Sequence, residues 1–84
     1  MSLEEKVVLV GDRCDLVKVI EALRVDLNEN PSEWVNQDLG GFLEALSAWV
    51  NDMDGFFLGR GLDVPKSPTW KNIAEMLVAA KYYE

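Results

Sequence analysis

The chain has no histidine, one cysteine and only eight basic residues against fifteen acidic ones. Without histidine, both the commonest general base and the commonest zinc ligand are missing. A single cysteine excludes an intrachain disulfide, and we interpret Cys14 as an inert thiol. Gly59-Arg60-Gly61 lacks the strand, loop and helix order of phosphate-binding motifs. These absences predict that the protein is not an enzyme and binds no metal or cofactor.

Long apolar runs are missing as well. None approaches the roughly 18 residues that a membrane-spanning helix needs, so we expect no membrane partner. Glu4 and Glu5 stand where a secretory signal carries positive charge, which predicts a cytoplasmic protein. Basic patches interleaved with aromatic residues are also absent, and we therefore expect no nucleic-acid partner.

The acidic residues are concentrated in the middle of the chain. Between Arg24 and Arg60 there is no basic residue, whereas the acidic window, residues 25–59, contains Asp26, Glu29, Glu33, Asp38, Glu44, Asp52 and Asp54. The acids and bases outside this window cancel, so the net charge of −7 belongs to the window. Such a field repels nucleic acid and attracts cationic proteins.

The spacing of apolar residues predicts a mainly α-helical fold. Apolar side chains recur at helical spacing over 12–28, 37–54 and 68–82, which predicts a three-helix bundle. A chain of 84 residues is short for more than one domain, so we expect a single domain over 1–84. The helix over 37–54 has the clearest pattern, because one arc of about 120° contains Leu39, Phe42, Leu43, Leu46, Trp49, Val50 and Met53.

Capping residues indicate where the helices begin and end. Asp12 is a typical N-cap for the first helix. Gly55 stands where a glycine ends the second helix, and Ser67-Pro68 is a typical start for the third. We therefore expect residues 55–67 to form a loop.

The segment before the first helix has a different pattern. Residues 6–10 are mostly β-branched and apolar and are followed by Gly11, which is typical of a short strand or an extended arm. A strand needs a pairing partner, and residues 61–64 are the other candidate.

The acidic window is the first candidate binding surface. Its acids are interpreted either as a solvated face that aids solubility or as a docking surface for a basic protein. In the second case we expect contacts from Asp26, Glu29, Glu33, Asp38, Glu44 and Asp52. Phe57 and Arg60 lie near its end, and aromatic and arginine side chains are typical binding anchors. The alternative is that the apolar run around Phe57 covers the core.

A stripe of small residues is the second candidate surface. Gly41, Ala45 and Ala48 are spaced at i, i+4 and i+7, outside the apolar arc of the same helix. Small side chains allow another backbone to approach closely. The stripe is interpreted either as a contact within the molecule or as a self-association surface that makes a homodimer.

One segment resembles a known family of small bacterial domains of unknown function, often encoded beside polymorphic toxins. The resemblance rests on the pattern Trp34-x-Asn36-x-x-Leu39-x-x-Phe42-Leu43-x-Ala45-x-x-x-Trp49, on Asp52-x-x-Gly55, and on Pro68-x-Trp70, Ala74 and Ala79-Ala80-x-Tyr82 or Tyr83-Glu84. It implies a shared fold and, from gene neighbourhood, an immunity role, but it identifies no catalytic residue. The family usually has a charged or polar residue where this chain has Gly40 or Gly41.

A weaker resemblance is to barstar, a ribonuclease inhibitor. Asp38-Leu39, Phe42, Ala45-Leu46 and Trp49 follow the spacing of its inhibitory helix, and Glu44 matches one of its acidic contact positions. Gly40 falls where barstar has another acid, and a parallel sheet is not evident in this sequence. We interpret this likeness as convergence of a helix pattern.

Three hypotheses about function follow. The leading one is a non-enzymatic immunity or inhibitor protein that occludes the cationic cleft of a basic toxin such as a nuclease. The second is a structural or regulatory module that self-associates through the stripe of small residues. The third is an anti-defence protein that mimics the charge of DNA with the same acidic surface.

Overall fold

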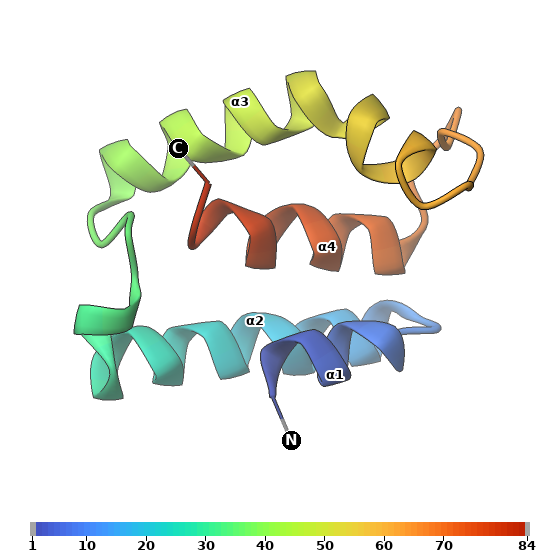
Figure 1. The fold of residues 1–84 in the computed structure, drawn as a ribbon. Helices are drawn as coiled ribbons and strands as arrows, with labels where there is room; N and C mark the ends of the chain where they lie inside the picture. Colours follow the sequence, from blue (N-terminus) through green and yellow to red (C-terminus); the bar gives the residue numbers. More distant parts are fainter. Residues whose placement is uncertain (1, 84) are drawn as a thin grey trace.

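The computed structural model describes residues 2–83 and is built from helices (Figure 1). In chain order the described elements are α1 (Leu3–Val8), α2 (Arg13–Glu29), the short 3₁₀ helix η1 (Pro31–Glu33), α3 (Leu39–Leu58) and α4 (Trp70–Ala80). No strand occurs in the described part of the chain. The predicted mainly α-helical bundle is therefore confirmed, with α1 as a helix that the sequence did not predict. None of these helices has the length and apolarity to cross a membrane.

The helices are stacked in three layers with α4 in the middle (Figure 1). α3 packs on one side of α4, and α2 and α1 pack on the other. The backbones of α2 and α3 do not approach each other anywhere in residues 2–83. α2 and α4 run in the same direction and α3 runs in the opposite one (Figure 1). Both outer layers therefore depend on α4 for their packing.

The largest buried cluster lies between α4 and the α1–α2 layer. Its buried members are Val7, Val10, Leu16, Val19, Leu23, Trp34, Ala74 and Val78. Ala74 is fully buried, and its small side chain lets α4 lie close to its neighbours. Trp70 is half-exposed. It is the first residue of α4 and lies at the edge of the stack.

Residues 6–10 do not form the predicted strand. Residues Leu3–Val8 are helical, and the hydroxyl of Ser2 caps this helix by accepting a hydrogen bond from the Glu5 amide at 3.1 Å. Val7 and Val10 are buried while Val8 and Leu9 are exposed. The helical turn points Val7 and Val10 toward α2 and α4, and that burial outweighs the weak β preference of valine.

Two of the predicted helix boundaries are wrong. α3 continues through Gly55 to Leu58, so Phe56 and Phe57 are helical rather than part of a loop. Phe57 is buried, and this burial offsets the cost of about 1 kcal/mol for a glycine inside a helix. α4 begins at Trp70 instead of 68, because Thr69 and Asn72 form a reciprocal capping box.

The predicted cap of α2 is confirmed. The carboxylate of Asp12 accepts a hydrogen bond from the Asp15 amide at 2.8 Å. α3 is capped in the same way by Asp38, whose carboxylate accepts from the Gly41 amide at 2.6 Å. Each cap satisfies a backbone donor that the helix itself leaves free.

Candidate functional site

A buried ion pair joins α2 to the end of α4. Lys81 Nζ lies 2.7 Å from Asp26 Oδ2, and the Lys81 side chain is only 4% exposed. The indole of Trp34 donates to Asp26 Oδ2 at 2.8 Å, and the side-chain amide of Asn30 donates to Asp26 Oδ1 at 3.1 Å. Lys81 also lies 4.8 Å from the centre of the Tyr82 ring. The pair is thus surrounded by hydrogen bonds and aromatic rings.

These contacts shift both pKa values toward the charged forms. The hydrogen bond from Lys81 lowers the pKa of Asp26, with help from Trp34 and Asn30, although burial acts in the opposite direction. Burial would lower the pKa of Lys81, but its contacts with Asp26 and Tyr82 outweigh burial and raise it. Both groups are therefore ionised at neutral pH.

The chain after α4 is held by a second set of contacts. The side-chain amide of Asn36 donates to the carbonyl oxygens of Ala80 at 2.9 Å and Tyr83 at 2.8 Å. The Lys81 carbonyl oxygen accepts from the backbone amides of Val35 at 3.1 Å and Asn36 at 3.3 Å. The Tyr83 hydroxyl donates to Asp52 Oδ2 of α3, which raises the pKa of Tyr83.

The Asp26–Lys81 cluster was not predicted from the sequence. Two signals pointed toward it. Trp34-x-Asn36 is part of the pattern that carries the family resemblance, and Lys81 is a lone charge after the apolar run of α4. Throughout residues 2–83 every buried side-chain nitrogen or oxygen has a hydrogen-bond partner. The cluster is fully satisfied, which fits a structural role.

Half of the predicted acidic contacts already have partners inside the molecule. Asp26 is paired with Lys81, Asp38 caps α3, and Asp52 accepts the hydrogen bond from Tyr83. Glu29, Glu33 and Glu44 are exposed. Asp26 differs from the other acids because Lys81 balances its charge and only 19% of its side chain is exposed, and its use as a partner contact stays a prediction.

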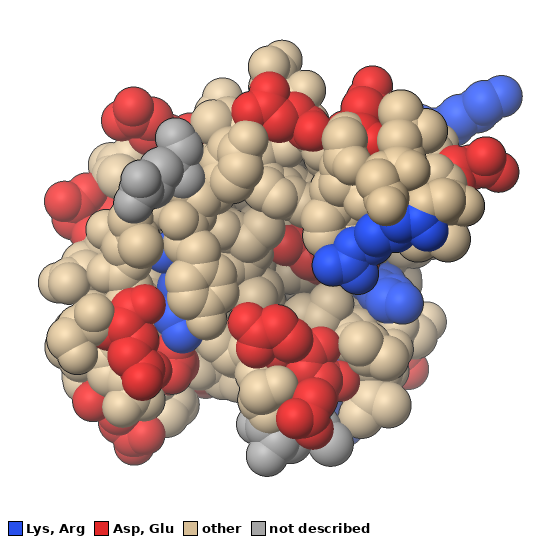
Figure 2. All heavy atoms as spheres, viewed as in Figure 1, with Lys and Arg blue, Asp and Glu red and all other residues tan. Residues whose placement is uncertain are grey.

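The exposed acids do not form one continuous face. Glu29 and Glu33 lie at the end of α2 and in η1, whereas Glu44, Asp52 and Asp54 lie on α3. At about 100° per residue, the three acids on α3 point in different directions around the helix. Figure 2 shows acidic side chains in several separate groups over the visible face. The predicted single docking face is therefore replaced by a distributed negative surface.

The two predicted anchors, Phe57 and Arg60, make contacts within the molecule. Phe57 is buried and packs edge-on against Phe56 at 5.1 Å, so it is not available to a partner. Arg60 is exposed and stacks over the Phe56 ring at 4.2 Å.

The stripe faces inward at its centre. Ala45 is 5% exposed, while Gly41 and Ala48 are half-buried. The stripe lies on the side of α3 that packs against α4, so the interpretation as a contact within the molecule fits this arrangement. Ala45 is buried within the molecule, and the use of the stripe for self-association stays a prediction.

The buried face of α3 is rotated relative to the predicted apolar arc. Ala45 and Trp49 are buried, but Leu39 is 72%, Leu43 53% and Val50 40% exposed. These three residues follow one another at i, i+4 and i+11, and they form one side of the helix. We call them the α3 flank. It is an apolar surface that the rest of the described chain leaves open.

A groove lies between this flank and α2. It has a volume of about 320 Å³ and is lined by Ile20, Leu23, Arg24, Leu27, Trp34, Asn36, Gln37, Asp38, Leu39, Phe42 and Leu77. Most of these side chains are apolar, and Leu77 of α4 contributes from the middle layer. The groove exists because α2 and α3 are separate layers joined through α4.

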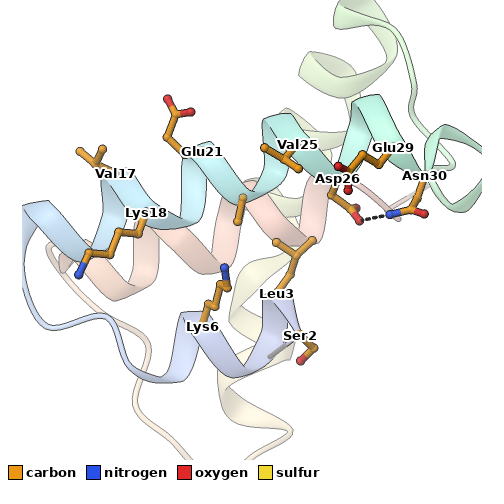
Figure 3. A pocket seen from close by; sticks show the side chains of 11 residues that line it. Ser2, Leu3, Lys6, Val17, Lys18, Glu21, Val25, Asp26, Glu29 and Asn30 are labelled. Carbon is orange, nitrogen blue, oxygen red and sulfur yellow. Dashed lines mark hydrogen bonds between the residues drawn. The ribbon is translucent and has the colours of Figure 1, made fainter.

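A second hollow lies between α1 and α2 (Figure 3). It has a volume of about 630 Å³. Leu3 and Val25 are among its apolar lining residues, while Lys6 from α1 and Lys18 and Glu21 from α2 supply charges of both signs. In Figure 3 these charged side chains are spread along the two helices instead of converging on one point.

The described residues also contain no candidate metal site. Among residues 2–83, histidine, cysteine, aspartate and glutamate side chains form no group of three or more that is able to hold a metal ion. The exposed Cys14 belongs to no such group.

Comparison with known proteins gives one match. A family model described as a family of unknown function, DUF7660, matches residues 12–84, which includes α2, α3, α4 and the Asp26–Lys81 cluster. No curated protein and no solved structure matches the chain.

Proposed function

The chain belongs to the DUF7660 family, and from its surface we propose that it is a non-enzymatic protein-binding domain for a cationic protein. In this proposal it acts as an immunity or inhibitor protein and covers the basic cleft of a toxin such as a nuclease. The supporting observation concerns the salt bridges that the acidic window forms within the molecule. Of its seven carboxylates, only Asp26 takes part in a salt bridge within the described residues.

The six acids of the window that form no salt bridge lie at the surface. Glu29, Glu33, Asp38, Glu44, Asp52 and Asp54 are all exposed. Their separate directions mean that the molecule attracts a cation from several sides instead of through one docking face. Such a field raises the rate at which an oppositely charged protein arrives more than it strengthens the final complex.

The proposal requires a short-range contact as well as this field. Charges separated by more than about 8 Å are largely screened at physiological ionic strength. The proposal therefore adds an apolar contact surface to the field of the acids, and the exposed α3 flank is available for it.

The experiment uses two charge variants with the same change in net charge. In the window variant, Glu29, Glu33 and Glu44 become Gln and Asp54 becomes Asn. In the control variant, the exposed acids Glu4, Glu5 and Glu21 become Gln and Asp63 becomes Asn. Each protein is used to capture partners from the source cells, and the captured protein is then purified for stopped-flow measurements at several salt concentrations.

We expect the captured partner to be basic and its association with the wild type to slow as salt is added. At low salt, the association rate of the window variant should be at least about tenfold lower than that of the wild type. The association rate of the control variant should fall less. A neutral or acidic partner, or equal rates for the wild type and the window variant, would overturn the proposal.

A further inference from the structure

The groove between α2 and α3 opens onto the exposed α3 flank, and Leu39 is the member of the flank that also lines the groove. From Leu39 to Val50 the α3 flank extends along eleven residues, which is about 17 Å or three helical turns. Ile20 of α2 is half-exposed on the opposite wall, and Leu77 of α4 forms part of the floor. α2 and α3 run in opposite directions along the two walls (Figure 1). One more helix laid between them would be in contact with all three layers.

The charged side chains around the groove determine which kind of molecule can bind in it. Two charged side chains line it, Arg24 and Asp38. Arg24 is already paired with Glu21 at 2.8 Å, whereas Asp38 keeps its negative charge while it caps α3. Asp54 lies one turn beyond Val50 on α3 and is exposed. The α3 flank thus has a carboxylate at each end.

A second copy of the chain does not match these charges. It would bring a net charge of −7 against another −7. A cationic helix has no such conflict, because its basic residues meet Asp38 and Asp54 while its apolar face covers Leu39, Leu43 and Val50. Amphipathic helices bind apolar grooves in this way in many complexes.

We propose that the groove between α2 and α3 binds a cationic amphipathic helix of the partner protein. This inference rests on the proposed function, since it takes the partner to be cationic. The apolar residues of that helix lie on Ile20, Leu39 and Phe42, and its lysine or arginine residues lie near Asp38 and Asp54.

The test uses three synthetic peptides of about 18 residues, long enough to exceed the three turns of the α3 flank. The first is an amphipathic helix of leucine and lysine. The second has the same composition in a scrambled order without an apolar face. The third is the amphipathic helix with glutamate in place of lysine. Each is titrated into the isotope-labelled full chain, and binding is mapped by changes in the NMR amide spectrum.

We expect the leucine–lysine helix to bind and to shift the amide signals of Ile20, Leu39 and Phe42 most. The other two peptides should bind at least about tenfold more weakly. A leucine–lysine peptide that binds but shifts only amides outside the groove overturns the groove as its site and leaves the charge-based function standing. Equal binding of the leucine–glutamate helix in the groove overturns the cationic occupant, whereas the proposed function fails only if the captured partner is not basic or associates equally fast with the window variant. If none of the three peptides binds, the groove proposal also fails.

Two variants on α3 distinguish binding in the groove from non-specific binding to exposed apolar side chains. Leu39→Gln changes the groove wall, and Leu58→Gln changes a leucine at the other end of the same helix; the two leucines are 72% and 64% exposed. Because both are surface positions, both variants should fold. We expect L39Q to weaken binding of the leucine–lysine helix about fivefold or more and L58Q less than about twofold. Equal effects of the two substitutions would overturn the proposal.

Discussion

Lys81 Nζ and Asp26 Oδ2 lie 2.7 Å apart beneath the surface and join the end of α4 to α2. Removing one partner leaves the other as a buried charge without compensation, which typically costs about 3–5 kcal/mol. A small domain has a total stability of only about 4–13 kcal/mol at typical values per residue. This single contact therefore affects whether the domain folds.

The first prediction is a double-mutant cycle on this pair. D26N leaves the buried Lys81 without its partner and should lower the free energy of unfolding by about 3–5 kcal/mol. K81M should lower it by less, because the Asp26 side chain is partly exposed and keeps its hydrogen bonds from Trp34 and Asn30. The double variant should lose less than the sum, because the amide oxygen introduced by D26N still accepts the Trp34 hydrogen bond and no charge is left buried. Urea denaturation of the four proteins measures the coupling. Additive losses would show that the two residues act independently.

The second prediction concerns acid. The pKa of Asp26 is lowered in the folded protein, so its contribution to stability is complete above its unfolded pKa of about 3.9. That contribution is lost as the pH falls through the lower folded pKa. Between about pH 5 and pH 2, the free energy of unfolding should fall more steeply for the wild type than for D26N/K81M. Urea denaturation at each pH tests this, and equal slopes would contradict it.

The third prediction concerns Tyr83, which donates to Asp52. The nearby carboxylate disfavours the phenolate, so Tyr83 should ionise above the ordinary tyrosine pKa of about 10. The chain has two tyrosines, and Y82F leaves Tyr83 as the only one in an absorbance titration. Adding Asp52→Ala should lower that pKa, whereas Asp54→Ala should not. The same pKa in both backgrounds would show that the hydrogen bond is absent in solution.

The fourth prediction compares Gly55 in the last turn of α3 with Gly59, the residue that caps the C-terminal end of this helix. A methyl group at Gly55 meets nothing within 4 Å, so G55A should raise the free energy of unfolding by up to about 1 kcal/mol. At Gly59 the same methyl group would lie 2.9 Å from the Gly55 carbonyl oxygen, so G59A should lower it. Thermal unfolding distinguishes the two directions. A shift of the same sign for both would contradict this account of the end of α3.

Local signals in the sequence located most of the helices. Asp12 caps α2 as predicted, and apolar spacing identified α2, α3 and α4. Residues 3–8 were missed because valine-rich segments are compatible with a strand or a helix. The decisive factor is packing against α2 and α4, which lie further along the chain. Helix ends were missed for the same reason, since Phe57 makes its burial contacts beyond the expected end of α3.

The candidate site was harder to predict than the fold. The apolar arc of α3 correctly included the buried Trp49 but missed Ala45, because its small side chain lets α4 approach on a side of the helix that the arc did not cover. The leucines on the other side stayed exposed as a result. The acids were identified by charge alone, and sequence spacing did not show that Asp26 is paired with Lys81. Contacts between residues as distant as Asn36 and Ala80, 44 positions apart, leave no local signal.

The middle position of α4 has a consequence for synthesis on the ribosome. Both outer layers rest on residues 70–80, which are made after every other helix described here. A nascent chain that already contains α2 and α3 still lacks the surface on which each of them is buried. Their apolar sides are therefore exposed until translation passes residue 80, and this interval is when the young polypeptide most needs protection by chaperones.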